Sequence, residues 1–152
     1  MQIDLCYIES PLGKIVAGAD PSGICLLEFA DENNYSIEEL NFRFKTYAFE
    51  FHYKVSDLLN QLSSELNEYF LGHRKSFTLP LSLYGTDFQK KVWNELLKIP
   101  FGTTSSYQQQ AIRLGNLSAI RAVAHANGTN KIAILVPCHR VIGSDGNLTG
   151  YA

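Results

Sequence analysis

Apolar and polar residues alternate near the start of the chain, which is the pattern of β-strands with one buried face. Ile3, Leu5 and Tyr7 stand between polar neighbours, and further apolar runs cover residues 14–19 and 24–29. Turn signals separate the three runs: Ser10-Pro11-Leu12-Gly13 and Asp20-Pro21-Ser22-Gly23. The pattern predicts three strands joined as an antiparallel meander.

Helical spacing replaces this alternation in the middle of the chain. We expect a helix or loop around Ser36–Phe44 and a strand at Ala48–Tyr53. Ser56 has the side chain of a helix N-cap, and Gly72 stands where a helix usually ends in glycine. Between them, apolar residues recur at helical spacing: Leu58, Leu59, Leu62, Leu66, Tyr69 and Phe70. The spacing predicts one longer helix.

Residues 73–85 have the composition of a linker, with Pro80 and Gly85 as breakers. We therefore expect two domains. The first is an α/β domain of residues 1–80 with a short antiparallel sheet, and the second is a mainly helical domain of residues 81–152.

Two capping boxes mark helix starts in the second half of the chain. Thr86 and Gln89 form the first box, and Pro100 ends the helix that follows it. That helix has one apolar side: Phe88, Val92, Trp93, Leu96 and Ile99. Ser106 and Gln109 form the second box and begin a short helix.

The outline of a helix-turn-helix follows from this second box. The short helix ends near Leu114, with Gly115 beyond it. We expect Ser118 to cap the next helix, which runs to about Asn127. Helix, short turn and helix in this order are typical of a DNA-binding module, although the outline also occurs by chance.

Arg121 lies near the start of the second helix of this motif, where side chains point at nucleic acid when such motifs dock. Tyr107 begins the first helix and either contacts nucleic acid or packs in the core. The alternative for Arg121 is a solvated arginine on an amphipathic helix. The residues around it are small, which suits close approach to a groove or to another helix: Ala119, Ala122, Ala124 and Ala126.

Cys138 is the residue on which the chemistry depends. The apolar run Ile132–Val136 predicts a buried strand that delivers Cys138 at its end, followed directly by His139 and Arg140. A cysteine reacts as thiolate, and a nearby imidazole or cation favours that form. Adjacent side chains of an extended chain point to opposite sides, so a turn or a bridging water must bring the imidazole to the sulfur. The alternative is a buried structural cysteine beside a surface histidine.

Composition and charge narrow the class of protein. The 152 residues are 45 % apolar, yet no apolar run has the length of a membrane span and the start is no secretory signal. Three cysteines argue against a disulfide scaffold, and no zinc-ligand spacing links them, so Cys6 and Cys25 are expected in the core. Residues 1–80 carry 6 basic and 12 acidic side chains, and residues 81–152 carry 7 basic and 3 acidic. The positive second half favours an anionic partner, unless the two halves simply differ in solvated charge.

Several motifs together resemble one family. Pro137-Cys138-His139-Arg140-Val141, with Gly150-Tyr151 shortly after, resembles the active-site segment of the O6-alkylguanine-DNA alkyltransferases, also called methylated-DNA–protein-cysteine methyltransferases. Asn130, eight residues before Cys138, also fits. Upstream motifs occur in the family's order: Thr86-Asp87-Phe88-Gln89, Val92-Trp93, Ile99-Pro100-Phe101-Gly102, Ser106-Tyr107 and Arg121-Ala122-Val123. The resemblance is close over residues 85–152 and weak over residues 1–84, where it implies a ribonuclease-H-like fold.

The resemblance implies DNA repair in a single turnover. Members of this family bind double-stranded DNA containing O6-alkylguanine through the minor groove and rotate the damaged base out of the stack. Arg121 would fill the gap, and Tyr107, Ser118 and Ala122 would complete the DNA contacts. No cofactor and no metal is implied. We expect a monomer without a membrane, in the cytoplasm or in the nucleus of a eukaryote.

The resemblance also assigns the chemistry. Cys138 attacks the alkyl carbon as thiolate, and His139 takes the thiol proton through a water as general base. Tyr107 donates a proton toward guanine N3, and Asn130 braces the turn that carries Cys138. The substrate pocket falls on three further residues: Val141, Tyr151 and Ala152.

The chain departs from the family's pattern at Ala152. Family members usually continue with a Gly-Gly step and a helix whose glutamate orients the active-site histidine. We expect His139 to lack this partner, either in a truncated chain or in one that repairs slowly. A non-catalytic lesion-binding module is therefore the alternative function. A cysteine hydrolase is a weaker alternative, because the segments before Cys138 do not resemble such enzymes.

Overall fold

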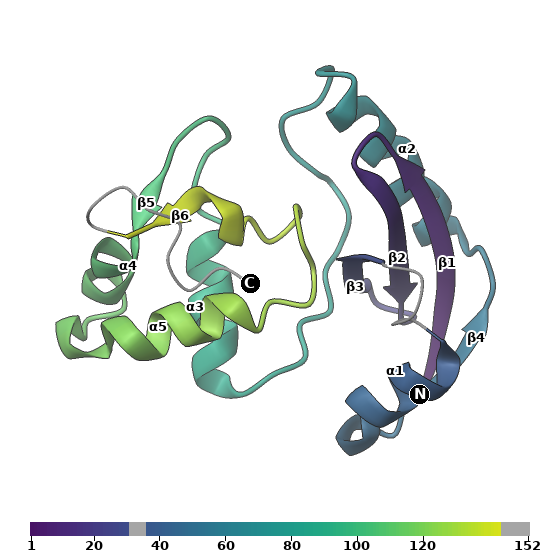
Figure 1. Cartoon of the computed structure of the whole chain (residues 1–152), viewed down its shortest axis with the longest axis horizontal. Coiled ribbons are helices and arrows are strands. Elements are labelled where there is room, and N and C mark those ends of the chain that lie inside the picture. The colour runs from purple at the N-terminus through teal and green to yellow at the C-terminus, as the bar shows by residue number, and fades with distance from the viewer. Residues whose placement is uncertain (31–35, 144–152) are drawn as a thin grey trace. The chain divides into compact units, whose positions relative to one another are not determined.

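The computed structural model describes residues 1–30 and 36–143 of the chain (Figure 1). The chain divides into two compact units, Met1–Ser82 and Leu83–Ala152, and each is described by itself.

The first unit is built on a mixed four-stranded sheet. Its strands are β1 Gln2–Ser10, β2 Gly13–Ala19, β3 Ile24–Phe29 and β4 Glu50–Tyr53. The predicted meander is confirmed, because β1 pairs antiparallel with β2 and β2 pairs antiparallel with β3. The sheet is not wholly antiparallel as expected: β4 joins the free edge of β1 in parallel, with Phe51 opposite Ile3. The chain between β3 and β4 runs back before it enters the sheet, which is what a parallel pairing requires.

Two α-helices complete the first unit. They are α1 Ile37–Arg43, followed by a 3₁₀ turn at Lys45–Tyr47, and α2 Asp57–Phe70. The predicted N-cap of α2 is confirmed, since the Ser56 hydroxyl accepts from the Leu59 N–H at 3.3 Å. Gly72 follows the helix with a φ of +79°, a conformation that favours glycine. Figure 1 shows α2 along one face of the sheet, and its buried residues supply that contact: Leu59, Leu62 and Leu66.

Two buried carboxylates hold the segment after α2 against the helix and sheet of the first unit. Glu65 accepts from the N–H of Thr78 at 2.9 Å and from its hydroxyl at 2.8 Å. Asp20 accepts from the Ser82 hydroxyl at 2.8 Å, and it also closes the β2–β3 turn by accepting from two backbone N–H groups. Gly23 permits this approach, because a Cβ atom there would lie 2.7 Å from the Pro80 carbonyl oxygen. The predicted linker is therefore ordered on the first unit as far as Ser82.

The second unit is mainly helical. Its elements are α3 Asp87–Leu96, β5 Ser105–Ser106, α4 Tyr107–Arg113, a 3₁₀ turn Leu117–Ala119, α5 Ile120–Gly128, a 3₁₀ turn Cys138–Arg140 and β6 Val141–Ile142. No helix within residues 1–30 and 36–143 is long and apolar enough to cross a membrane.

Both predicted capping boxes are present in this unit. Thr86 and Gln89 exchange hydrogen bonds between side chain and backbone at the start of α3, and Ser106 and Gln109 do the same at α4. The apolar side of α3 is buried through Val92, Trp93 and Leu96, and by Ile99 beyond it, but Phe88 is 38 % exposed because it lies in the first turn, ahead of the packed part.

Two local predictions in this unit are wrong. Ser118 does not cap α5: Asn116 accepts from the Ser118 N–H and hydroxyl, the chain forms a 3₁₀ turn, and α5 begins at Ile120 with no side-chain cap. Residues 133–136 form turns rather than a strand, with Ile134 at a φ of +70°. The run is buried at Ile132 and Val136, as an apolar pattern requires, but among the described residues these turns belong to neither of the two sheets.

Candidate active site

Cys138 lies at the start of a tight turn rather than at a strand end. The Cys138 N–H donates to Val136 O at 2.9 Å, and the Arg140 N–H donates to Pro137 O at 3.0 Å. The Val141 N–H closes the 3₁₀ helix Cys138–Arg140 by donating to Cys138 O. The Cys138 side chain is half-buried. Cys138 and His139 therefore lie in a turn, one of the two arrangements expected to bring the imidazole to the sulfur, whereas the strand expected to lead into it is absent from residues 132–137.

Asn130 holds the turns that lead to Cys138. Its side-chain amide donates to Val136 O at 2.8 Å and to Ile132 O at 3.3 Å, and its oxygen accepts from the Ile132 N–H at 2.9 Å. One side chain thus satisfies the backbone at both ends of the segment 132–136. These bonds replace the ladder that a strand would have used, which explains why a buried apolar run forms turns here.

Tyr107 is the first residue of α4 and is only 7 % exposed. Burial raises the pKa of its phenol, and the charge of the Cys138 thiolate raises it further. The two side chains are therefore near enough to interact electrostatically, although 30 residues separate them in the chain. A phenol with a raised pKa keeps its proton at neutral pH and is available as a proton donor.

His139 is exposed, yet the partial burial of its side chain lowers its pKa, and the positive charge of Arg140 lowers it further. The imidazole is therefore neutral at pH 7 and able to accept a proton. Arg140 is fixed in place, since its guanidinium donates to Ile99 O at 2.7 Å and lies 5.7 Å from the ring centroid of Phe101.

Val141 is fully buried and pairs with Ser105 where β6 runs parallel to β5. The β5 strand leads directly into Tyr107, so this pairing joins the segment after Cys138 to the start of α4. Tyr151 and Ala152, the other residues predicted for the substrate pocket, lie outside the described residues.

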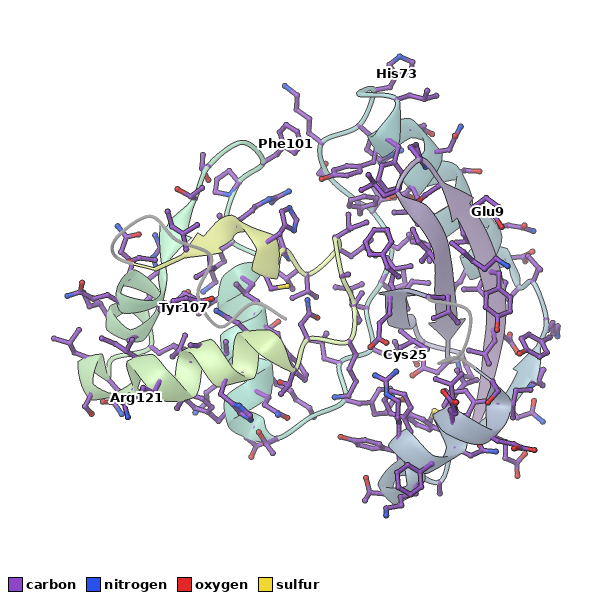
Figure 2. The ribbon with its side chains drawn as sticks, viewed as in Figure 1. Glu9, Cys25, His73, Phe101, Tyr107 and Arg121 are labelled. Carbon is purple, nitrogen blue, oxygen red and sulfur yellow. The ribbon has the colours of Figure 1, made fainter. Side chains whose placement is uncertain are left out.

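Apart from the buried Tyr107, the residues predicted to contact DNA lie at the surface around the start of α5. Arg121, Ala122 and Ser118 are all exposed, and Arg121 lies in the first turn of α5 (Figure 2). Asn130, which braces the segment leading to Cys138, follows the C-terminal end of α5, whereas Arg121 lies in its first turn.

Sequence reasoning missed an amide pair between the two helices of the helix-turn-helix. Gln110 on α4 and Asn127 on α5 are buried and hydrogen-bonded to each other. A signal was available: Gln110 neighbours buried Ala111, and Asn127 stands four residues after Val123, so both polar residues occupy inward positions of their helices.

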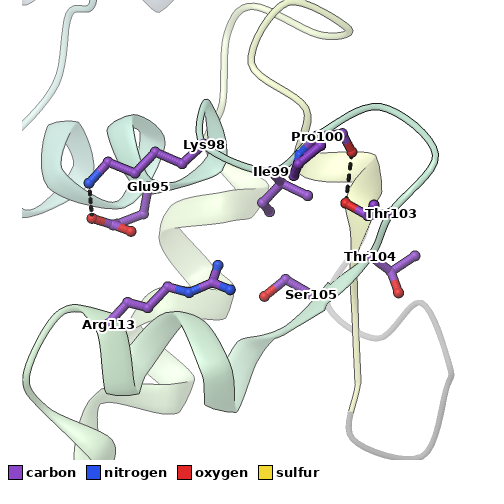
Figure 3. A pocket seen from close by; sticks show the side chains of 8 residues that line it. All are labelled: Glu95, Lys98, Ile99, Pro100, Thr103, Thr104, Ser105 and Arg113. Atoms are coloured by element: carbon purple, nitrogen blue, oxygen red, sulfur yellow. Dashed lines mark hydrogen bonds and ion pairs between the residues drawn. The ribbon is translucent and has the colours of Figure 1, made fainter.

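A cavity of about 140 Å³ lies elsewhere in the second unit, where α3 ends and α4 ends (Figure 3). It contains none of the predicted site residues, and the Glu95–Lys98 ion pair of 2.8 Å borders it. Within the described part of the chain, no group of three or more His, Cys, Asp or Glu residues gathers to hold a metal ion.

Comparisons with known proteins agree over both units. Residues 5–83 match the family model of the 6-O-methylguanine DNA methyltransferase ribonuclease-like domain, and residues 87–152 match that of its DNA binding domain. The chain is 42 % identical over 144 residues to the methylated-DNA–protein-cysteine methyltransferase of Methanosarcina acetivorans, covering 95 % of this chain and 86 % of that protein. It is 40 % identical over 144 residues to the constitutive enzyme of Bacillus subtilis, covering 95 % and 83 %.

Solved structures give the same result. The O6-methylguanine methyltransferase of Mycobacterium tuberculosis superposes with a TM-score of 0.80 at 39 % identity, covering 99 % of this chain and 84 % of that one. The Mycobacterium tuberculosis protein OGT in complex with DNA superposes with a TM-score of 0.79 at 37 % identity, covering 100 % and 84 %. Since family models match both units and relatives above 30 % identity span nearly the whole chain, this chain belongs to the 6-O-methylguanine DNA methyltransferase family.

Proposed function

We propose that this protein repairs O6-alkylguanine in double-stranded DNA by transferring the alkyl group irreversibly to Cys138. Membership of the family supplies the reaction class. The observation that carries the assignment to Cys138 is its place in an Asn130-braced turn beside the buried phenol of Tyr107. Cys6 and Cys25 are the other cysteines, and both are buried in the first unit, with burial raising the pKa of each thiol.

The reaction balances with the groups at the site. His139 accepts the thiol proton of Cys138 through a water, and the sulfur attacks the alkyl carbon. The bond between that carbon and O6 breaks, and guanine leaves with a proton that Tyr107 donates to N3. The proton on His139 then passes through solvent to the Tyr107 phenolate, which restores both groups. A stable thioether remains on Cys138, so each molecule acts once. The damaged base itself supplies the alkyl group, and no cofactor enters the balance.

The lowered pKa of His139 supports its role, because a general base must be unprotonated before it can act. The raised pKa of Tyr107 means that its phenol holds a proton at neutral pH, as a proton donor must. At neutral pH the imidazole is thus unprotonated and the phenol protonated, which are the states from which a general base and a proton donor act.

DNA binding is assigned to the exposed start of α5. We propose that Arg121 fills the space left by the rotated guanine, with Ser118, Ala122 and Tyr107 along the minor groove. The backbone at Cys138 and Val141 would bind the guanine edge; Cys138 O already accepts from the Val141 N–H and has a second lone pair free for an amine. Tyr151 and Ala152 would complete the pocket. We propose a monomer that acts in the cytoplasm, or in the nucleus of a eukaryote.

Intact mass measurement tests the function directly. After incubation with a duplex containing O6-methylguanine, we expect a gain of one methyl group, located by peptide mapping on Cys138. The Cys138→Ala variant is the control and should gain nothing while still binding the duplex. Lesion-dependent binding by the wild-type chain without any methyl gain would contradict the transferase and favour the lesion-binding module.

A further inference from the structure

Gln110 and Asn127, the amide pair between α4 and α5, are almost completely buried although both side chains are polar. Gln110 is 0 % exposed and Asn127 is 4 % exposed. The Asn127 amide donates to the Gln110 oxygen at 2.7 Å, and the Gln110 amide donates to the Asn127 oxygen at 3.3 Å. The two bonds form a closed ring, so the two amides bind each other in a single mutual orientation.

The position of the pair relates it to the candidate active site. Gln110 is three residues after Tyr107 on α4, almost one helical turn further on. Asn127 is in the last turn of α5, three residues before Asn130. The pair therefore links the helix that carries Tyr107 to the helix end that leads into the Cys138 turn.

The same end of α5 is also bound to α3. The indole N–H of Trp93 donates to Ala126 O at 2.9 Å, and Thr129 donates its hydroxyl to the same oxygen at 2.8 Å. Gln89 of α3 donates to the Thr129 hydroxyl at 3.3 Å. The C-terminal end of α5 is thus held to α3, and the amide pair joins the same end of α5 to α4.

Stability alone does not account for such a pair. Burying two amides removes their hydrogen bonds to water, and replacing both partners of a buried hydrogen bond by apolar groups of similar shape is often neutral or stabilising. Hydrogen bonds are directional, however, whereas apolar contacts tolerate sliding and rotation. The specific contribution of the pair is thus geometric: it fixes the rotation and register of α4 against α5.

We infer that Gln110 and Asn127 are positioning residues that hold the phenol of Tyr107 in its place relative to the sulfur of Cys138. This inference rests on the proposed function for its meaning in catalysis. Neither residue touches the substrate; both act through the placement of Tyr107 and of the turn that Asn130 braces.

The test replaces both amides by an apolar pair. In the double variant Gln110→Leu/Asn127→Leu, we expect an equal or higher Tm and a Kd for lesion duplex within about threefold of wild type, since Arg121 lies at the far end of α5. The single-turnover rate constant at saturating DNA should fall by at least about tenfold, because small misplacement of a catalytic group is costly. A stable, DNA-binding variant that transfers slowly supports positioning; one that transfers at the wild-type rate overturns it.

Further variants cover the other outcomes. Gln108→Leu makes the same chemical change on the exposed face of α4 and should leave the rate unchanged. If the double leucine variant does not fold, Gln110→Asn is used: it shortens one partner and should slow transfer, and adding Asn127→Gln should rescue the rate by restoring the combined length. A folded Gln110→Asn variant with the wild-type rate would overturn the inference.

Failure of the proposed function has a separate readout. If wild-type protein transfers no methyl group, the rate at which iodoacetamide alkylates Cys138, measured across pH and located by peptide mapping, still reports the surroundings of the sulfur. We expect the double leucine variant to change that rate or its pH profile, because Tyr107 moves relative to Cys138. Identical profiles for the two proteins would overturn the positioning role without any reference to repair.

Discussion

Arg121 tests the proposed extrusion of the damaged base at the level of a single side chain. It is exposed in the first turn of α5, remote from the Cys138 turn. We expect Arg121→Ala to slow transfer from a lesion duplex by about tenfold or more, because nothing then stabilises the gap left by the extruded guanine. Transfer from a single-stranded oligonucleotide should change much less, since its bases are already unpaired.

The control for Arg121 is Arg113→Ala. Arg113 is exposed on α4 and has no proposed role, and its replacement removes the same charge. Any effect of lost positive charge on the transfer rate should therefore appear in both variants. Equal losses for Arg121→Ala on duplex and single strand would contradict extrusion and leave only a role in overall binding.

His139 predicts the pH dependence of transfer. As general base it must be neutral, so the rate falls on the acidic side as the imidazole gains a proton. Because burial and Arg140 lower its pKa below 6.5, the rate should be constant from pH 7 to 8 and fall only below the ordinary histidine value. Arg140→Gln removes one of the two causes, so the pKa rises and the acidic fall should begin at higher pH.

Single-turnover rate constants between pH 5 and 8 measure this effect. Arg140→Lys retains the positive charge and should leave the acidic limb near its wild-type position, which separates charge from the loss of the Arg140–Ile99 hydrogen bond. An acidic limb that Arg140→Gln leaves in place would mean that a different group titrates.

At the level of the element, three of the four predicted helix caps are present and one is not. Ser56, Thr86 and Ser106 cap their helices as expected, because each bonds an N–H three residues ahead. Ser118 is also a serine, but its N–H donates to the Asn116 side chain in a 3₁₀ turn. The helix α5 therefore begins two residues later, at Ile120. Asn116 and Ser118 can both cap a helical turn, and the one that does so is Asn116, which comes earlier in the chain.

This competition predicts unequal effects of two similar substitutions. Asn116→Ala removes the acceptor of the 3₁₀ turn before α5 and should lower the free energy of unfolding by about 1 kcal/mol. Ser118→Ala keeps the backbone bond to Asn116 and should change it by less than about 0.5 kcal/mol. Denaturant unfolding of both variants beside wild type measures the difference. A larger loss for Ser118→Ala would restore Ser118 as the cap.

At the level of the whole molecule, charge is divided between the two halves of the chain. Residues 1–80 have a net charge of −6 and residues 81–152 a net charge of +4, while the total is only −2. The positive charge of the second half favours association with DNA there. Contact with only two phosphates would weaken duplex binding by about tenfold between 50 and 200 mM salt, and more contacts would steepen this dependence.

Titration of an undamaged duplex across that salt range measures the dependence. Alkylation of Cys138 by a neutral reagent such as iodoacetamide provides the control and should be insensitive to salt. A Kd that stays constant from 50 to 200 mM would rule out an electrostatic interface on the second half.

Much of the architecture was readable from sequence because it depends on near neighbours. Alternation located β1 to β3, and capping boxes located α3 and α4, since a strand face and a cap are properties of a few consecutive residues. The residues of the site were identified by motif, which records residue type and spacing. Neither local pattern nor motif shows that β4 joins the sheet in parallel, or that an apolar run such as 132–136 forms turns instead of a strand.

Those features were decided only by packing between distant parts of the chain. Residues 132–136 look like a strand, but Asn130 takes their hydrogen bonds and turns the segment toward the Cys138 turn. Tyr107 interacts electrostatically with Cys138, 31 positions further on, and Gln110 bonds Asn127, 17 positions further on, because α4 packs against α5 and β5 pairs with β6. Local pattern specifies which groups a protein has available for chemistry, whereas long-range contacts specify which of them meet, because burial of polar groups is tolerated only where a partner is in place.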